Sequence, residues 1–187
     1  MRSICVYCGS SPGRRPEYIE VAGVLARLLV ANGIGLVYGG GRVGVMGILA
    51  DAVMAAGGEV TGIIPQDFVD KEVAHGGLTG LHVVGSMHER KALMADLADA
   101  FIALPGGFGT VEELFEILTW AQLGLHEKPC GLLNVGGYYD ALIAFLDFAV
   151  AEKFVQEQHR ALLIVEEDPE ALLKKFEAYE PQNWKSG

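Results

Sequence analysis

Residues 100–113 have the sequence AFIALPGGFGTVEE, which contains three structural signals in succession. Ala100–Leu104 is an apolar run of the length of a buried strand. Three glycines follow, and after them apolar residues recur at helical spacing, at Val111, Leu114, Phe115 and Leu118. A glycine-rich turn between a strand and a helix lets backbone N–H groups approach an anion, and the helix N-terminus favours negative charge. The stretch therefore predicts a phosphate-binding turn made by Gly106, Gly107, Gly109 and Thr110.

Glu113 lies one turn inside the predicted helix Val111–Leu123. A carboxylate repels a phosphate, so a site for phosphate alone has no use for one at this place. We therefore expect Glu113 to act on a group attached to the phosphate. Thr110 and Glu113 also have capping-box spacing, which gives Glu113 an alternative, purely structural role. Glu116 is one turn further along and is placed to pair with Glu113 as a second carboxylate.

Strands and helices alternate along the rest of the chain. Further strands are predicted at Ser3–Tyr7, Gly35–Tyr38, Val60–Ile64, Leu81–Val84, Cys130–Asn134 and Leu162–Val165. Further helices are predicted at Pro16–Asn32, Val43–Ala56, Met87–Ala98, Tyr138–Lys153 and Pro169–Ala178. Such alternation predicts an α/β fold, a Rossmann-like doubly wound parallel sheet with helices on both faces. We expect one domain at residues 1–180, a tail at 181–187, and a long loop or lid at 65–80.

A second glycine-rich turn, Gly39–Gly44, fits the pattern G-x-G-x-x-G and lies between a predicted strand and a predicted helix. A dinucleotide site also needs an acid at the end of the next strand, and that strand ends at Ile64-Pro65. This disfavours NAD. A contact to a mononucleotide or a phosphorylated sugar is favoured over a turn that serves packing alone.

A third site element is Ser86-Met87-His88-Glu89-Arg90-Lys91, which opens the helix Met87–Ala98. Ser86 and Glu89 form a capping box. Helical geometry predicts a core-facing stripe of Met87, Met94 and Ala98, flanked by Arg90 on one side and Lys91 on the other. Positive charge near a helix N-terminus is disfavoured by the helix dipole, and a partly buried cation needs an anionic partner. Arg90 and Lys91 are therefore expected to belong to a binding site, unless their side chains extend to solvent.

Composition excludes several classes of protein. The chain has 187 residues, is 51% apolar, and carries a formal charge of −10, which argues against nucleic acid as a partner. No apolar run reaches the length of about 20 residues that a membrane span needs, and the N-terminus does not resemble a signal peptide. Three cysteines are too few for a disulfide framework, so we expect a cytoplasmic protein.

No metal site is expected. Cys5 and Cys8 form a C-x-x-C, but residues three apart on a strand point to opposite faces, and no further ligands occur at matching spacing.

The helix containing residues 138–150 is apolar on nearly all sides. Either it is covered within one protomer, or it or the helix carrying Trp120 lies in a dimer interface.

The pairing of Pro105–Glu113 with Met87–Lys91 resembles the LONELY GUY family of nucleotide 5′-monophosphate phosphoribohydrolases, which activate cytokinins. Supporting matches extend over nearly the whole chain, at residues 5–11, 38–41, 119–124, 131–135 and 137–139. The resemblance implies a homodimer that hydrolyses the N-glycosidic bond of AMP or an N6-prenylated AMP, without a cofactor. It implies Arg90 and Glu113 as catalytic residues. Substrate contacts are expected from the phosphate turn and from Met87, Lys91, Gly40, Gly41 and Glu116.

Two other functions stay open at this point. A general AMP nucleosidase of purine salvage would need the same residues. A nucleotide-binding or sensing module without catalysis would share the fold, since Rossmann-like folds host many functions. The presence of both Arg90 and Glu113 favours an enzyme over a module that only binds.

Overall fold

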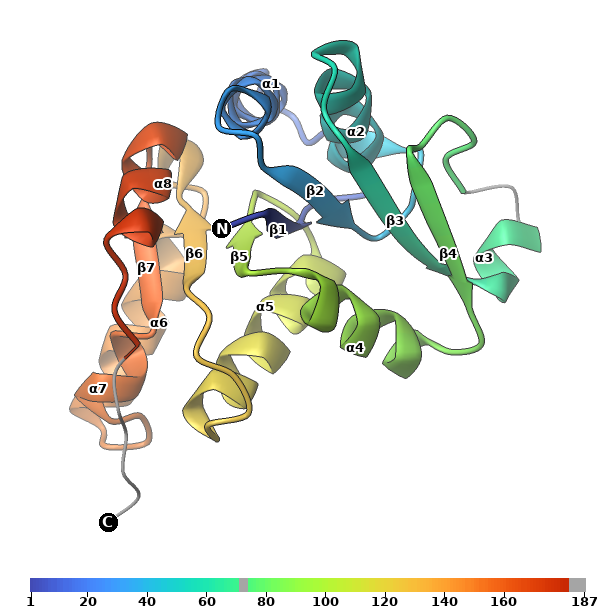
Figure 1. Ribbon diagram of the computed structural model, residues 1–187. Coiled ribbons are helices and arrows are strands. Elements are labelled where there is room, and N and C mark those ends of the chain that lie inside the picture. Colours follow the sequence, from blue (N-terminus) through green and yellow to red (C-terminus); the bar gives the residue numbers. More distant parts are fainter. Residues whose placement is uncertain (71–73, 182–187) are drawn as a thin grey trace.

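The computed structural model of the chain describes residues 1–70 and 74–181 (Figure 1). The described residues contain seven strands that form one parallel sheet. The strands are β1 Ser3–Tyr7, β2 Gly35–Tyr38, β3 Val60–Pro65, β4 Gly80–Val84, β5 Ala100–Ala103, β6 Cys130–Leu133 and β7 Leu163–Glu166. Their order across the sheet is β4-β3-β2-β1-β5-β6-β7. The predicted α/β class and parallel sheet are confirmed.

Helices cover both faces of this sheet, as predicted (Figure 1). One face packs against α1 Glu17–Ala31, α2 Gly44–Ala55 and α8 Pro169–Glu177. The opposite face packs against α4 Met87–Leu97, α5 Phe108–Gln122 and α6 Asp140–Ala151. The central strands β1 and β5 pair from Ile4 with Ala100 to Tyr7 with Ala103, and β5 is buried along its whole length. Burial from both sides explains why these strands are continuous apolar runs without alternation.

The order of the strands fixes where a ligand can bind. From β1 the chain builds outward through β2, β3 and β4, then crosses back to place β5 on the other side of β1. The direction of winding therefore reverses between β1 and β5. In doubly wound sheets, ligands bind beyond the carboxyl ends of the strands at such a switch point. The turn after β5 is the glycine-rich stretch of the sequence, so topology and motif indicate the same place.

Four details of the predicted elements are wrong. The segment 65–80 contains the short helix α3, Gln66–Asp70, and residues 71–73 lie outside the described part. Helix α5 begins at Phe108, three residues before the predicted start. The predicted helix Tyr138–Lys153 is α6 Asp140–Ala151, which begins two residues later than predicted and follows an unpredicted 3₁₀ turn, η1 Val135–Gly137. A four-residue helix, α7 Glu157–Arg160, was not predicted. The two short helices are too brief to show a period.

No helix in the described residues is long and apolar enough to cross a membrane. The two cysteines of the C-x-x-C diverge as predicted, because Cys5 packs in the core on the α4/α5 side and Cys8 packs in the core on the α1/α2 side. Most of the predicted tail, residues 182–187, lies outside the described residues.

Candidate active site

A cavity of about 560 Å³ opens at the switch point. Its walls come from the turns that follow β1, β2 and β5, from the end of β3, and from helices α2, α3, α4 and α5. The lining residues are Cys8, Gly9, Ser10, Gly39, Gly41, Val43, Met46, Ile64, Pro65, Phe68, Met87, Arg90, Gly107, Phe108, Gly109, Thr110 and Glu113. Glycine backbone, apolar side chains and one pair of opposite charges thus face a common space. This composition is typical of a small-molecule site.

The turn between β5 and α5 supplies backbone groups to this cavity. Gly107 is the N-cap residue of α5, and Gly107, Gly109 and Thr110 line the cavity. Gly106 does not line it, and it lies against the turn after β1, where a Cβ at Gly106 would come within 2.9 Å of the Gly9 nitrogen. The start of α5, whose first N–H groups have no partner within the helix, therefore lies at the space where the sequence predicts a phosphate.

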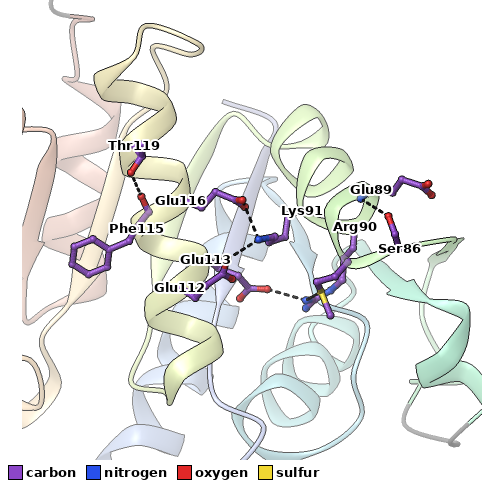
Figure 2. Close-up of polar contacts among 10 residues, drawn as sticks. Ser86, Glu89, Arg90, Lys91, Glu112, Glu113, Phe115, Glu116 and Thr119 are labelled. Carbon is purple, nitrogen blue, oxygen red and sulfur yellow. Dashed lines mark hydrogen bonds and ion pairs between the residues drawn. The ribbon is translucent and has the colours of Figure 1, made fainter.

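The capping-box alternative for Glu113 is wrong. Thr110 is the third residue of α5, and the N-cap residue Gly107 has no side chain to cap the helix. The early helix start also places Glu113 in the second turn, where the helix dipole acts weakly. Its carboxylate instead meets the guanidinium of Arg90, with Oε1 2.9 Å from Nη1 (Figure 2). The side chain of Glu113 is only 10% exposed and that of Arg90 13%.

Arg90 is held by three groups at once. Besides its contact with Glu113, its Nε donates to the backbone oxygen of Ile63 at 3.2 Å, and its Nη1 lies 3.1 Å from the sulfur of Met87. The guanidinium also lies directly over Gly39, where a Cβ would overlap Nη2. The turn after β2, strand β3 and helix α4 thus combine to place one cation beside the carboxylate of α5.

Burial raises the pKa of the Glu113 carboxyl, while the Arg90 guanidinium opposes this shift. Two further charges act more weakly: Glu112 raises the pKa of Glu113, and Lys91 lowers it. A buried carboxyl whose pKa is shifted by burial and by a specific charge partner, and which lines a cavity, is a candidate functional group. The cavity gives this pair access to a ligand, which a purely structural ion pair does not need.

Lys91 makes a second bridge between α4 and α5. Its Nζ lies 2.6 Å from Glu112 Oε1 and 3.0 Å from Glu116 Oε1 (Figure 2). The prediction that both cations of the motif have anionic partners is confirmed. The predicted pairing of Glu113 with Glu116 is wrong, because each of these carboxylates meets a different cation. Neither Lys91 nor Glu116 lines the cavity.

Ser86 caps α4 as predicted, since its hydroxyl accepts from the Glu89 N–H at 3.1 Å and Glu89 bonds back to the Gly85 N–H. Met94 and Ala98 are buried in the core as predicted. Met87 is not, because its side chain is partly exposed and faces the cavity. This removes Met87 from the predicted core stripe and places it at the site.

The turn after β2 contributes Gly39 and Gly41 to the cavity wall, whereas Gly40 does not line it. Gly40 has a φ of +72°, which glycine adopts without strain. Its oxygen accepts from the His75 N–H at 2.9 Å, and Gly41 pairs with Ala74 in a single bridge. The segment around residue 75 thus fixes this turn from outside.

Sequence reasoning missed two parts of the cavity. The first is the turn Cys8-Gly9-Ser10 after β1, which belongs to the site because β1 borders the switch point. Burial raises the pKa of the Cys8 thiol strongly, so Cys8 is no thiolate nucleophile. The second is an apolar wall, in which Phe108 is 98% exposed at the cavity. Residues 5–11 and Phe108 fall within the motifs of the sequence, but only the strand order shows that their side chains and backbone border the cavity.

Among the described residues, no group of three or more His, Cys, Asp or Glu side chains is arranged to hold a metal ion. The charged side chains that line the cavity are Arg90 and Glu113, and they lie beside the β5–α5 turn. Together the fold and the site define a Rossmann-like protein with a cavity at the switch point of its sheet, lined by glycine-rich turns and by a carboxylate–guanidinium pair.

Comparison with known proteins identifies the family. A family model described as "possible lysine decarboxylase" matches residues 46–176. The cytokinin riboside 5′-monophosphate phosphoribohydrolase LOG from Oryza sativa subsp. japonica is 50% identical over 181 residues, covering 97% of this chain and 75% of its own. LOG5 from Arabidopsis thaliana, with the same activity in its name, is 49% identical over 97% of this chain and 80% of its own. The chain belongs to this LONELY GUY family.

Solved structures confirm the fold alone. The molybdenum cofactor binding protein from Rippkaea orientalis aligns with a TM-score of 0.71 at 24% identity, over 95% of this chain and 96% of its own. The molybdenum cofactor carrier protein from Chlamydomonas reinhardtii aligns with a TM-score of 0.70 at 22% identity, over 95% of this chain and 99% of its own.

The description "possible lysine decarboxylase" does not fit the lysine of this site. Burial lowers the pKa of Lys91, but the bonds from Glu112 and Glu116 raise it by more, so the net shift is upward. A Schiff-base lysine must be deprotonated and free to attack a carbonyl. Lys91 is instead a protonated bridge between two helices.

Proposed function

We propose that this chain hydrolyses the N-glycosidic bond of adenosine 5′-monophosphates that carry an N6-prenyl group, or of AMP itself, and releases the base and ribose 5-phosphate. The relatives named above carry this type of activity in their names. The observation that carries the proposal is the 2.9 Å pair of Arg90 and Glu113 at the wall of a cavity that also contains the backbone donors of the β5–α5 turn.

The chemistry follows from where charge develops. Cleavage at C1′ of the ribose passes through an oxocarbenium-like state, in which the sugar becomes positive and the departing base negative. Water forms the new C1′–O bond, the C1′–N bond breaks, and the proton from water ends on the base. The carboxylate of Glu113 stabilises the positive sugar and orients the water. Arg90 keeps Glu113 ionised and helps to position the base.

Phosphate binding supplies orientation. The N–H groups of Gly107 and Gly109, at the start of α5, hold the 5′-phosphate, and Thr110 adds its hydroxyl. Energy from this remote contact is available to align the sugar with Glu113. Met87 and Gly41 line the same cavity. Lys91, Glu116, Gly40 and Gly106 do not line the cavity. We therefore assign these four residues an indirect contribution to substrate binding, through the helices and turns that carry the lining residues.

The test is product formation. The purified chain, incubated with AMP and with an N6-prenylated AMP, should release free ribose 5-phosphate without any added cofactor. Nucleosides without the 5′-phosphate should react at least a hundredfold more slowly, by an order-of-magnitude estimate for the loss of one anchored anion. Equal rates for nucleoside and nucleotide would contradict the phosphate site.

Two alternatives give different results in this assay. A binding or sensing module retains the nucleotide and releases no ribose 5-phosphate. A general AMP nucleosidase releases it with a kcat/KM for AMP that equals or exceeds the value for the prenylated nucleotide. The apolar wall of the cavity, with Val43, Met46, Ile64 and Phe68, favours a substrate that carries an apolar N6 group.

We further propose a homodimer. The idea that one protomer covers α6 on all sides is wrong, because Leu146 and Ala149 are buried while Phe145 is 59% and Phe148 61% exposed. Exposed aromatic side chains on one helix are typical of a surface that another chain covers. Light scattering should give twice the mass of one chain, and a monomer would contradict the proposal.

We also propose a cytoplasmic location. All three cysteines are buried and free, as expected for a protein that folds in a reducing compartment. Fractionation of cells that express the tagged chain should recover it with soluble cytoplasmic markers, and recovery from an oxidising compartment would argue against this location.

A further inference from the structure

We propose that the Tyr138 hydroxyl is a positioning group that turns the Gly107 N–H toward the phosphate. This inference rests on the function proposed above, because it assigns a role within the same phosphate site. The observation that carries it is a hydrogen bond from behind the turn: the Tyr138 hydroxyl donates to the Gly106 oxygen at 2.7 Å.

The position of this hydroxyl is well defined. The ring of Tyr138 packs edge-to-face against Tyr18, with centroids 5.4 Å apart, and against Tyr139, with centroids 4.7 Å apart. The preceding turn η1 is held by Arg15, whose Nη1 donates to the Gly136 oxygen at 3.1 Å. The two flanking rings and this anchored turn restrict where the hydroxyl can lie.

The hydrogen bond to the Gly106 oxygen also determines the direction of the Gly107 N–H, because both groups belong to one planar peptide unit. The described chain has no cis peptide bonds, so the Gly106 C=O and the Gly107 N–H of one planar unit point in opposite directions. The carbonyl points to Tyr138, which does not line the cavity, whereas Gly107 does. Within the described residues, the Gly107 N–H donates to no other protein group. The N–H is thus free and directed toward the cavity.

The neighbouring tyrosine offers a matched comparison. The Tyr139 hydroxyl donates to the Leu104 oxygen at 2.8 Å, two residues before the Gly106 oxygen that Tyr138 contacts. The peptide unit that begins with the Leu104 carbonyl ends at the nitrogen of Pro105, which has no hydrogen. Tyr139 also has a backbone hydrogen-bond interaction with Gly106, which does not line the cavity, so Tyr139 braces the same turn without orienting the Gly107 N–H. It is also more buried than Tyr138, so loss of its hydroxyl perturbs folding more.

The experiment compares Tyr138→Phe with Tyr139→Phe. Calorimetry measures the Kd of ribose 5-phosphate and of adenine, two ligands that the chain cannot hydrolyse. Tyr138→Phe should raise the Kd of ribose 5-phosphate about fivefold to tenfold, the range expected when one charge-assisted hydrogen bond is misaligned. Its Kd for adenine should stay within about twofold of the original. Tyr139→Phe should lower Tm more, yet leave both Kd values within about twofold.

A second measurement needs no variant. Inorganic phosphate added to the ¹⁵N-labelled chain should shift the amide signal of Gly107 more strongly than that of Gly106. The inference is overturned if Tyr138→Phe binds ribose 5-phosphate as the original does, if both variants lose it equally, or if the Gly107 signal stays in place. The proposed function fails in a different way, when the chain binds ribose 5-phosphate but never produces it from AMP.

Discussion

Gly39→Ala separates the Arg90–Glu113 pair without removing either charged group. A Cβ at Gly39 would overlap the Arg90 guanidinium and come within 3.0 Å of its Cζ. The guanidinium must then move, which breaks the 2.9 Å contact with Glu113 and the 3.2 Å bond to the Ile63 oxygen. Breaking a buried ion pair costs about 3–5 kcal/mol, and the cavity lets water reach the separated groups, so we take the lower limit of about 3 kcal/mol.

If catalysis uses this pairing, a loss of about 3 kcal/mol corresponds to roughly a hundredfold lower kcat/KM for an N6-prenylated AMP. The assay is ribose 5-phosphate release at saturating and limiting substrate. The control is Gly23→Ala in α1, where a Cβ meets only Arg27 Nη1 at 3.6 Å and where alanine should raise stability by about 0.5–1 kcal/mol. A Gly39→Ala protein that is folded and retains kcat/KM within threefold would refute the reasoning, because the pair would then be dispensable.

Three further predictions concern charge, metal and assembly. Because burial raises the pKa of Glu113 and activity needs its ionised form, turnover should fall as the pH drops through that raised pKa. Lys91→Met should move this acidic limb to higher pH and Glu112→Gln to lower pH, and shifts in the same direction would contradict the charge assignment. Since the described residues offer no metal-binding cluster, EDTA should leave kcat unchanged, whereas inactivation that zinc or magnesium restores would count against the site. Phe145→Glu should yield a monomer in light scattering, and an unchanged dimer would place the interface elsewhere.

The sequence predicted the fold because local and global signals agree along the chain. Strand and helix periods, glycine-rich turns and the Ser86 cap all predict the same α/β layers. The wrongly predicted elements are of two kinds. Helices α3 and α7 are too short to show a helical period, and α5 begins at Phe108-Gly109, where glycine is an unusual residue for a helix. Gly136 and Gly137, with φ of +57° and +72°, form part of the turn η1 that precedes α6 and was not predicted.

The candidate site was predictable only where a motif marks it. Arg90 and Glu113 stood out because a cation near a helix start and a carboxylate near a phosphate turn both need a partner, and they prove to be partners of each other. The pairing of Lys91 with Glu116 depends on how α4 and α5 align, which helical spacing within one helix does not determine. The turn after β1 lies at the site because β1 is next to β5 in the sheet, and this strand order cannot be derived from any single segment of sequence.

Glu113→Gln tests the central claim most directly, with Glu112→Gln as the neighbouring control on the same helix. Calorimetry should show that both variants bind an N6-prenylated AMP within a few-fold of the original chain. Only Glu113→Gln should lose ribose 5-phosphate release, by about a hundredfold or more, the order expected when a group that stabilises the transition state is removed. Release by Glu113→Gln at the rate of the original chain would contradict the account, because the carboxylate beside Arg90 would then take no part in the hydrolysis.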